Sequence, residues 1–407
     1  MRCGLLGRKL GHSYSPQIHG MLGTYDYDLI EVEPEDLESF LKNGDFHGLN
    51  VTIPYKKSVI PYLFDLCLVT DQIGAVNTIL RLENGQLIGF NTDYTGFQSM
   101  VEQSGLTVSG KKVLVLGSGG ASFAVVEALE TMGAVPVVIS RSGENNYENL
   151  HRHADASILV NATPVGMYPH VDDSPVDLDK LPNLEGVLDL IYNPARTKLL
   201  LDAQDRGLVA MNGLWMLVAQ AKESAQIFTN QQIHQEKIGQ IHRTLKGQME
   251  NIILIGMPGC GKTTVGKHLA QKTKRQFVDA DKEIEALAGK SIPEIFAQDG
   301  EDAFRTYETQ VLADLGKQSG LIIATGGGCV TRQENYNHLH RNGTIFWLQR
   351  DISALPTDGR PLSASGKLED MYRIRKPLYE AFSDYIVQNR TPIQASGEIL
   401  NIIGVSV

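Results

Sequence analysis

The chain has few cysteines and no long apolar run, and both absences narrow its possible functions. Its four cysteines, Cys3, Cys67, Cys260 and Cys329, stand far apart and form no C-x-x-C pair. This pattern suits a reducing compartment and gives no metal-site spacing. No apolar stretch approaches the roughly 18 residues that a membrane helix needs. The early return of charged residues at the N-terminus argues against a signal peptide. We therefore expect a cytoplasmic protein with no membrane partner.

Basic residues are outnumbered by acidic ones. The 37 Lys and Arg residues against 47 Asp and Glu residues give a net charge of −10. This balance argues against nucleic acid as a partner, so any phosphate must bind in a local pocket. We find no internal repeat. The length of 407 residues, with 42% apolar and 21% charged residues, predicts a globular chain of two or three domains.

A strand, a glycine-rich turn and a helix follow one another at residues 251–270. Within them, Gly256, Gly261, Lys262 and Thr263 match the P-loop spacing. Glycines let backbone N–H groups turn inward around a phosphate, and the helix N-terminus adds partial positive charge. The pattern predicts that Lys262 reaches the β and γ phosphates of ATP and that Thr263 holds Mg²⁺. The alternative is a chance match in an ordinary strand–turn–helix unit.

The residues expected to contact ATP lie in this turn and the start of its helix: Gly256, Gly259, Cys260, Gly261, Lys262, Thr263 and Thr264. Cys260 stands at the helix N-terminus, where the pKa of a thiol falls. We therefore expect Cys260 to react with thiol reagents and bound ATP to protect it.

A second strand–glycine turn–helix unit, at residues 111–125, precedes the P-loop and lacks its lysine–threonine ending. Gly117 and Gly119 take the first two places of a dinucleotide-binding fingerprint. Ser122 stands in the third place, where glycine or alanine is usual, so the match to the general pattern is imperfect.

The strand that follows this unit indicates which dinucleotide binds. An NAD site normally places an acidic residue at the end of that strand, but here the strand ends in Ser140 and Arg141. Arginine accommodates a 2′-phosphate, which favours NADP. The alternative is that Arg141 is a surface residue and that Glu144 supplies the carboxylate.

Short apolar strands in the first hundred residues end in polar side chains, as binding sites in α/β proteins often do. Ser15 before Pro16 has the pattern of a helix N-cap with proline at the first helical position. Lys56 follows a strand, and Asp93 precedes a helix. Each residue has an ordinary alternative, because Ser15 and Asp93 could only cap helices and Lys56 could be a solvated surface charge.

Seven patterns occur in one order along the first part of the chain: Ser13-Tyr14-Ser15, Asn50-Val51-Thr52-Ile53-Pro54-Tyr55-Lys56, Gly74-Ala75-Val76-Asn77-Thr78, Asn91-Thr92-Asp93, Gly117-Ser118-Gly119-Gly120-Ala121, Asn161-Ala162-Thr163-Pro164-Val165-Gly166-Met167, and Gln220. Because these seven patterns occur together and in this order, roughly residues 1–230 resemble the shikimate dehydrogenase family. The resemblance implies two α/β subdomains, one for the substrate and one of Rossmann type for NADP.

The resemblance also implies residue roles. Lys56 and Asp93 would be the catalytic pair, which agrees with the need of a developing alkoxide for a proton donor. Substrate-binding roles are implied for Ser13, Ser15, Thr52, Asn77, Gln220 and Tyr192. NADP-binding roles are implied for Gly117, Ser118, Gly119, Gly120, Ala121, Ser140, Arg141, Asn161 and Thr163. Ser140 departs from the asparagine that the family usually has before its arginine.

After the P-loop helix, carboxylates at Asp279 and Asp281 follow a strand, and acids capping the next helix are the ordinary alternative. Further patterns are Phe304-Arg305, Gly326-Gly327-Gly328, Gly359-Arg360-Pro361 and Arg375-Lys376-Pro377-Leu378-Tyr379. With the P-loop, these patterns resemble shikimate kinase over about residues 250–395.

This second resemblance implies that Asp281 positions the acceptor hydroxyl and that Asp279 lies in the water shell of the Mg²⁺ that Thr263 holds. Arg305 and Arg375 would clamp the substrate carboxylate, for which the planar guanidinium is suited. Gly327 and Gly328 would line the same site, and Arg360 would stabilise the transferring phosphoryl group from a lid. The contacts to adenine stay open.

These observations together predict a bifunctional α/β enzyme. The predicted domains are a substrate-binding subdomain at 1–98, completed by helices at about 214–230, a Rossmann-type subdomain at 99–213, a helical connector at 231–249, and a P-loop kinase domain at 250–407. We expect the segment from 214 to about 245 to be one long helical stretch. The expected reactions are NADPH-dependent reduction of 3-dehydroshikimate and Mg·ATP-dependent phosphorylation of shikimate. Quinate as the first substrate and a non-catalytic quinate-responsive regulator are the alternatives, and the oligomeric state is not predicted.

Overall fold

The structure, a computed structural model, describes residues 1–11, 13–355 and 367–405. The chain divides into two compact units. The first unit comprises Met1–Gly166, Asp172–Tyr192 and Lys198–His242, and the second comprises Met167–Val171, Asn193–Thr197 and Arg243–Val407. Both units are α/β and contain sheets of parallel strands, so the predicted fold class is confirmed.

The first sheet of the first unit has six strands in the order β2-β1-β3-β5-β6-β4. Their bounds are β1 Arg2–Gly7, β2 Asp26–Glu31, β3 Gly48–Val51, β4 Asp65–Leu66, β5 Thr78–Arg81 and β6 Leu87–Phe90. Strands β1 and β3 are parallel, with Leu6 opposite Val51. The loops that follow these two strands therefore leave from the same edge of the sheet.

The helices that accompany this sheet are α1 Ser15–Leu22, α2 Leu37–Asn43, α3 Leu68–Ile73, α4 Thr92–Ser104 and α7 Leu214–Thr229. Short 3-10 helices lie at η1 Pro34–Asp36 and η2 Ile60–Tyr62. The expected single helical stretch from 214 to about 245 is wrong. Asn230 adopts a left-handed backbone with φ 51°, which ends α7, and α8 begins only at Glu236 and ends at Met249.

The second sheet of the first unit has five parallel strands in the order β11-β10-β9-β7-β8. Their bounds are β7 Lys112–Leu116, β8 Val135–Ile139, β9 Ile158–Asn161, β10 Gly186–Asp189 and β11 Val209–Asn212. The accompanying helices are α5 Gly120–Thr131, α6 Lys198–Asp205, η3 Tyr147–His153 and η4 Leu178–Lys180.

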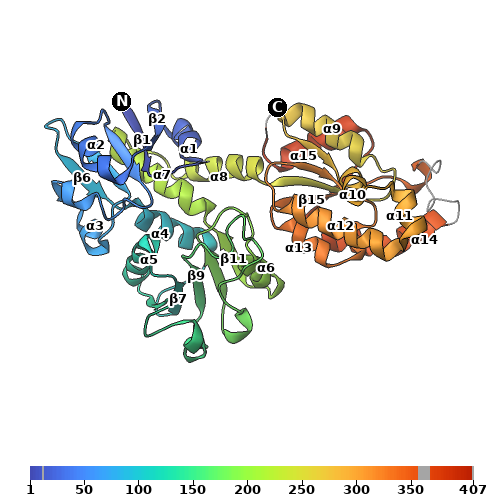
Figure 1. Ribbon diagram of the computed structural model, residues 1–407, viewed down its shortest axis with the longest axis horizontal. Coiled ribbons are helices and arrows are strands. Elements are labelled where there is room, and N and C mark those ends of the chain that lie inside the picture. Colours follow the sequence, from blue (N-terminus) through green and yellow to red (C-terminus); the bar gives the residue numbers. More distant parts are fainter. Residues whose placement is uncertain (12, 356–366, 406–407) are drawn as a thin grey trace. The chain divides into compact units, whose positions relative to one another are not determined.

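Strand β7 is buried on both faces, as its run of apolar residues predicts. Val113 and Val115 pack into the core that includes α4 and α5, whereas Leu114 and Leu116 pack into the core that includes α6. Figure 1 shows α5 and α6 on opposite sides of this sheet. The burial of both faces fixes the end of β7, and with it the position of the glycine turn that follows.

The sheet of the second unit has five parallel strands in the order β13-β14-β12-β15-β16. Their bounds are β12 Asn251–Ile255, β13 Phe277–Asp279, β14 Ile322–Ala324, β15 Gly343–Gln349 and β16 Tyr385–Gln388. The sheet lies between α9 and α15 on one face and α12 and α13 on the other (Figure 1). The helices are α9 Lys262–Thr273, α10 Ala280–Ala288, α11 Ile292–Gln298, α12 Gly300–Gly316, α13 Glu334–His340, α14 Lys367–Phe382 and α15 Pro392–Ile402, with η5 Cys329–Thr331 and η6 Ile352–Ala354.

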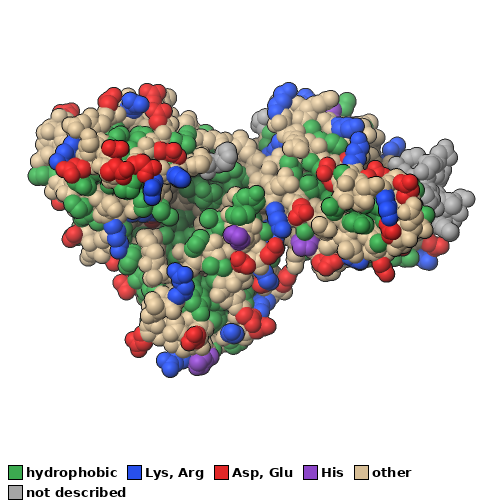
Figure 2. Space-filling view, in the orientation of Figure 1, with side chains coloured by type: hydrophobic (Ala, Val, Ile, Leu, Met, Phe, Trp, Pro, Cys, Tyr) green, Lys and Arg blue, Asp and Glu red, His purple; other side chains and the backbone are tan. Residues whose placement is uncertain are grey.

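The surface agrees with the charge balance of the sequence. On the face drawn in Figure 2, acidic and basic side chains lie interspersed over the described residues. Within those same residues, no helix has both the length and the apolar character to cross a membrane.

Candidate active sites

The first unit holds a pocket of about 270 Å³ at the edge where β1 and β3 end. Every residue predicted to be catalytic or to bind substrate in this part of the chain lines it: Ser13, Ser15, Thr52, Lys56, Asn77, Asp93, Tyr192 and Gln220. The topology explains the convergence. The Ser13 and Thr52 loops leave from parallel neighbouring strands, and the backbone N–H of Val51 donates to the carbonyl of Asn77 just before β5.

Lys56 and Asp93 form an ion pair in this pocket. The Nζ of Lys56 lies 2.6 Å from Oδ2 of Asp93, and the side chains are 20% and 12% exposed. The alternative that Asp93 only caps α4 is wrong, because Asn91 accepts the backbone N–H of Asp93 as the cap. The carboxylate of Asp93 is therefore left to orient the ammonium group of Lys56.

Ser13 and Ser15 lie at the start of α1, but neither side chain caps the helix. The helix starts at Ser15, its N-cap is Tyr14, and no side-chain cap hydrogen bond is present. The prediction that Ser15 is the N-cap was therefore wrong. Instead, the backbone N–H of Ser15 donates to Oγ of Ser13 at 3.2 Å. This bond holds the two serines together at the pocket wall.

The amide of Asn77 is held in one orientation by the residues beneath the pocket. Its Oδ1 accepts the backbone N–H of Thr92 at 2.7 Å and the hydroxyl of Thr78 at 3.1 Å. Its Nδ2 donates to Oγ1 of Thr92 at 3.1 Å. An amide nitrogen carries two hydrogens, so the remaining N–H is available to a ligand. Ser224 of α7 ties into the same network through Asn50.

The predicted NADP residues gather at the edge where β8, β7 and β9 end together, since Leu116 lies opposite both Ile139 and Asn161. The loop Gly117–Gly119 follows β7, and α5 begins at Gly120. Arg141 lies beyond the end of β8 and is exposed. Ala121 of α5 also lines the 270 Å³ pocket. The start of the helix that follows the glycine turn and the Lys56–Asp93 pair therefore line the same pocket.

Hydrogen bonds account for two polar residues at this edge, Ser122 and Asn161. Ser122, the unusual third member of the fingerprint, is 2% exposed, and its hydroxyl donates to the carbonyl of Gly119 at 2.6 Å. The hydroxyl thus closes the turn without an unsatisfied polar group. Asn161 accepts from the hydroxyl of Thr163 at 2.7 Å and donates to Asp189 at 3.0 Å, which fixes the loop after β9.

The second unit holds a pocket of about 460 Å³ around the turn between β12 and α9. Of the residues predicted for the kinase, those that line it are Gly259, Gly261, Lys262, Thr263, Thr264, Asp279, Asp281 and Gly327. Lys262 is buried, and its Nζ donates to the carbonyls of Gly256 and Met257 at 2.8 and 3.1 Å. The side chain of Lys262 therefore folds back over the turn between β12 and α9.

The hydroxyl of Thr263 donates to Oδ2 of Asp279 at 3.1 Å. A hydroxyl and a carboxylate oxygen are hard ligands of the kind that Mg²⁺ takes in nucleotide sites, where phosphates and water complete the shell. The chain therefore offers residues that fit Mg²⁺. Among the described residues, no group of three or more His, Cys, Asp or Glu side chains forms a metal site without a nucleotide.

Asp281 lies in the first turn of α10, beside the P-loop lysine. Burial raises the pKa of its carboxyl, Lys262 lowers it and Asp279 raises it again, and the net shift is upward. Asp279 is the N-cap position of α10, but it makes no side-chain cap bond. The alternative that these two acids only cap the helix is therefore wrong for Asp279, and Asp281 faces the pocket.

Arg305 and Arg375 are not among the residues that line this pocket, but both contact the glycine run, of which Gly327 lines it. Arg305 is buried, with its Nη1 2.6 Å from Oε2 of Glu308. A Cβ on Gly328 would come within 2.3 Å of that same nitrogen, so a larger residue at this position would displace the guanidinium. Arg375 donates to the carbonyl of Gly327 at 3.1 Å. Both arginines therefore contact the glycine run. Arg360, the predicted lid arginine, lies outside the described residues.

Cys260 corrects one prediction. Its side chain is 1% exposed and packs in the core of the second unit, and its carbonyl accepts Nδ2 of Asn389 at 2.6 Å. A buried thiol is not reachable by a reagent in solution. The expected labelling of Cys260 and its protection by ATP are therefore wrong.

Comparison with known proteins identifies the families that both parts of the chain resemble. Residues 5–79 match the shikimate dehydrogenase substrate binding domain, and residues 258–403 match shikimate kinase. A shikimate dehydrogenase (NADP(+)) of Clostridium beijerinckii is 37% identical over 253 residues, which are 56% of this chain and 92% of that protein. The chain belongs to the shikimate dehydrogenase family.

Solved structures extend the likeness to the fold of the first part. The chain matches a chorismate mutase/shikimate 5-dehydrogenase fusion protein from Clostridium acetobutylicum with 36% identity and a TM-score of 0.58, over 60% of this chain and 97% of that one. It also matches a shikimate 5-dehydrogenase from Thermus thermophilus in complex with NADP(H) and shikimate, with 31% identity and a TM-score of 0.56, over 60% and 99%. The dehydrogenase is joined to a shikimate kinase domain in one chain.

Several residues of the two sites were missed by sequence reasoning. Met216 and Leu217 line the dehydrogenase pocket, and their spacing of four and three residues from Gln220 on a predicted helix could have revealed them. Glu308, which pairs with Arg305, follows the same three-residue spacing on α12. Arg350 lines the kinase pocket just beyond β15, and no sequence pattern marks it.

Proposed function

We propose that the first unit reduces 3-dehydroshikimate to shikimate and that the second unit phosphorylates shikimate at its 3-hydroxyl. The observation that carries the first assignment is the 2.6 Å contact between Lys56 and Asp93 in a pocket that also includes Ala121 of the dinucleotide helix. NADPH, when bound at the glycine turn, supplies the hydride. Lys56 gives a proton to the oxygen on which negative charge develops, and Asp93 holds the ammonium group in place.

The polar residues of the same pocket would recognise the substrate of the first unit. Ser13 and Ser15 would bind the carboxylate with their hydroxyls, and Asn77 would offer its remaining N–H to a ring hydroxyl. Arg141 would contact the 2′-phosphate of NADP, since its guanidinium is exposed beyond β8. The relatives named above as NADP(+) enzymes support this cofactor choice.

In the second unit, Lys262 would hold the β and γ phosphates of ATP, and Asp281 would take the proton of the acceptor hydroxyl. The raised pKa of Asp281 supports this role, because it makes the carboxylate a stronger proton acceptor. Arg305 and Arg375 would bind the substrate carboxylate. Mg²⁺, when bound by Thr263 and Asp279, would neutralise phosphate charge.

Two separate assays on the full chain test both assignments. We expect NADPH oxidation with 3-dehydroshikimate and ADP release with shikimate from one preparation. Lys56→Ala should lower only the first rate, by about 10²–10⁴-fold as for loss of a positioned acid. Lys262→Ala should lower only the second. The matched controls are Lys57→Ala and Lys267→Ala, which remove exposed neighbouring lysines. If Lys56→Ala and Lys57→Ala had equal effects, the proposed dehydrogenase chemistry would be wrong.

Quinate remains a second candidate substrate for the first unit. A quinate dehydrogenase from Corynebacterium glutamicum shares the fold of the first part at 27% identity and a TM-score of 0.55. Steady-state rates with quinate and shikimate on the same enzyme separate the two. A non-catalytic regulator is disfavoured, because Lys56, Asp93, Lys262 and Asp281 are all present.

The two reactions share shikimate, which the first produces and the second consumes. We expect the acid to pass between the units by free diffusion. A coupled assay with labelled external shikimate measures this, since full mixing of the label follows from diffusion.

A further inference from the structure

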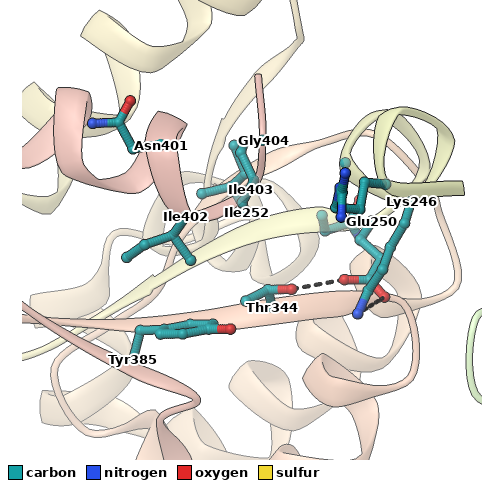
Figure 3. Close-up of a pocket in the computed structure, with 12 residues that line it drawn as sticks. Lys246, Glu250, Ile252, Thr344, Tyr385, Asn401, Ile402, Ile403 and Gly404 are labelled. Atoms are coloured by element: carbon teal, nitrogen blue, oxygen red, sulfur yellow. Dashed lines mark hydrogen bonds and ion pairs between the residues drawn. The ribbon is translucent and has the colours of Figure 1, made fainter. Parts of the chain in front are cut away.

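A second pocket of the second unit lies at the edge of the sheet opposite the phosphate loop. It has a volume of about 390 Å³ and lies where β12, β15 and β16 begin, between the last turns of α8 and the end of α15 (Figure 3). β12 runs from Asn251, which lines this pocket, to Ile255, which precedes the phosphate loop. At about 3.3 Å per residue, the strand separates the two pockets by roughly 17 Å.

One wall of this pocket is charged. Arg243 is exposed, and its guanidinium makes no hydrogen bond or ion pair with any residue that the structure describes. Lys246 makes one ion pair there, in which its Nζ lies 3.9 Å from Oε1 of Glu250. Two cations at the rim, one unpaired and one loosely paired, are suited to a carboxylate.

The same wall contains the carboxylate of Glu250, which can accept a further hydrogen bond. Glu250 is 8% exposed, and its Oε2 accepts the hydroxyl of Thr344 at 2.7 Å. Its Oε1 has cations only at 3.9 Å, from Lys246 and from Arg196 of the segment Asn193–Thr197, and it accepts no hydrogen bond from the described residues. Oε1 can therefore accept a charge-assisted hydrogen bond from a ligand.

The facing wall is apolar. Ile252 is 1% exposed at the base, and Ile402 and Ile403 are partly buried against the core. The ring of Tyr385 remains 45% exposed. In Figure 3, the isoleucines lie on one side and Lys246 and Glu250 on the other. A mostly apolar pocket of a few hundred cubic ångströms with a few polar groups is typical of small-molecule sites.

We propose that this pocket binds a free α-amino acid with an apolar or aromatic side chain. The ammonium group donates to Oε1 of Glu250, and the carboxylate lies between Arg243 and Lys246. The side chain packs on the isoleucines and on the ring of Tyr385. A simple anion would use only the cations and would meet the carboxylate of Glu250, so the combination of charges selects a zwitterion.

Titration calorimetry on the full chain with L-phenylalanine as the probe tests the proposal. The chain is first saturated with NADPH, shikimate and ADP, combinations that cannot react, so that the two active sites are filled. We expect one phenylalanine to bind per chain. Arg243→Ala should weaken its Kd by about tenfold or more, as loss of a charge-assisted hydrogen bond does. Arg373→Ala, which removes another exposed arginine outside the pocket, is the matched control and should leave Kd unchanged.

Two further probes separate the contributions of the charges. 3-Phenylpropionate lacks the ammonium group and phenethylamine lacks the carboxylate, and each should bind about tenfold or more weakly than phenylalanine. Glu250→Gln should reduce the affinity for phenylalanine but not for 3-phenylpropionate. The proposal is overturned if phenylalanine does not bind to the saturated chain, if 3-phenylpropionate binds equally well, or if Arg243→Ala binds like the native chain. Both enzyme activities of the same preparation are measured in parallel, so a failed proposed function is recognised separately.

Discussion

The buried pair between Arg305 and Glu308 gives the sharpest prediction for the second unit. The two side chains are 8% and 1% exposed and lie 2.6 Å apart. Burial lowers the pKa of Arg305, but Glu308 and Glu301 together outweigh this effect and the net shift is upward, so the guanidinium stays charged. Glu308→Ala leaves that charge buried without its main partner. We expect a loss of stability confined to the second unit.

The size of the loss follows from the contacts. Removing one partner of a buried ion pair costs about 3–5 kcal/mol. Glu301 remains 3.1 Å from the other guanidinium nitrogen, but its side chain is 63% exposed, and an exposed pair contributes at most about 1 kcal/mol. Burial raises the pKa of Glu308 in the native chain, and repulsion by Asp281 also raises it. Loss of Glu308 relieves this repulsion. We expect a net loss of about 3 kcal/mol.

Scanning calorimetry measures this loss. For a unit of this size, about 3 kcal/mol corresponds to a fall in Tm of roughly 6–12 °C in the transition of the second unit. The transition of the first unit should not move. Glu301→Ala, which removes the exposed partner of the same arginine, is the control and should lower Tm by about 4 °C or less. The KM for shikimate in the kinase assay should rise in Glu308→Ala. Equal Tm values for the two variants would refute the assignment of the buried pair as the stabilising one.

Three further predictions concern single residues. Burial raises the pKa of Asp281, so kinase kcat/KM should fall with decreasing pH at a higher pH than for an ordinary aspartate, as a pH–rate profile would show. Since the folded-state pKa exceeds the unfolded one, the ionised carboxylate lowers stability at neutral pH. Asp281→Asn should therefore raise the Tm of the second unit at pH 7, and this gain should vanish below the unfolded pKa. Cys67 is exposed whereas Cys3, Cys260 and Cys329 are buried, so thiol titration of the native chain should find one fast group, absent in Cys67→Ser. Arg141→Ala should reduce the preference for NADPH over NADH by about 10- to 100-fold in kcat/KM. An unchanged NADPH/NADH ratio would indicate that Arg141 is only a surface residue and that Glu144 supplies the carboxylate at this site.

Most of the fold and of the two sites could be predicted from residue patterns along the chain. The P-loop and the dinucleotide turn are local, because a strand, glycines and a helix N-terminus follow one another within about fifteen residues. The dehydrogenase pocket could be assembled because its polar residues follow strands whose ends meet at one edge. The order of these patterns, rather than any one of them, made the family recognisable.

The errors came from properties that depend on tertiary packing. Ser15 has the composition of an N-cap, but its helix begins one residue earlier than the pattern indicates. Cys260 has the position of a reactive thiol, yet the core covers it. Glu308 pairs with Arg305 through a local three-residue spacing on α12, but the burial of the pair comes from its packing against the glycine run, which the sequence does not show.

The two edges of the kinase sheet explain why one kind of site is visible in the sequence and another is not. At the edge where β12 ends, a single turn from Gly256 to Lys262 supplies most of the phosphate site, so the spacing of a few residues encodes it. At the edge where β12 begins, the pocket is assembled from Arg243–Glu250, Thr344, Tyr385 and Asn401–Gly404, which are more than 150 residues apart at their extremes. The three charges lie close together in the segment 243–250, but no local spacing links them to Thr344, Tyr385 and the end of α15, which they meet only in the folded chain. A site of this kind is found from the folded chain alone, and its ligand must be argued from the chemistry of its walls.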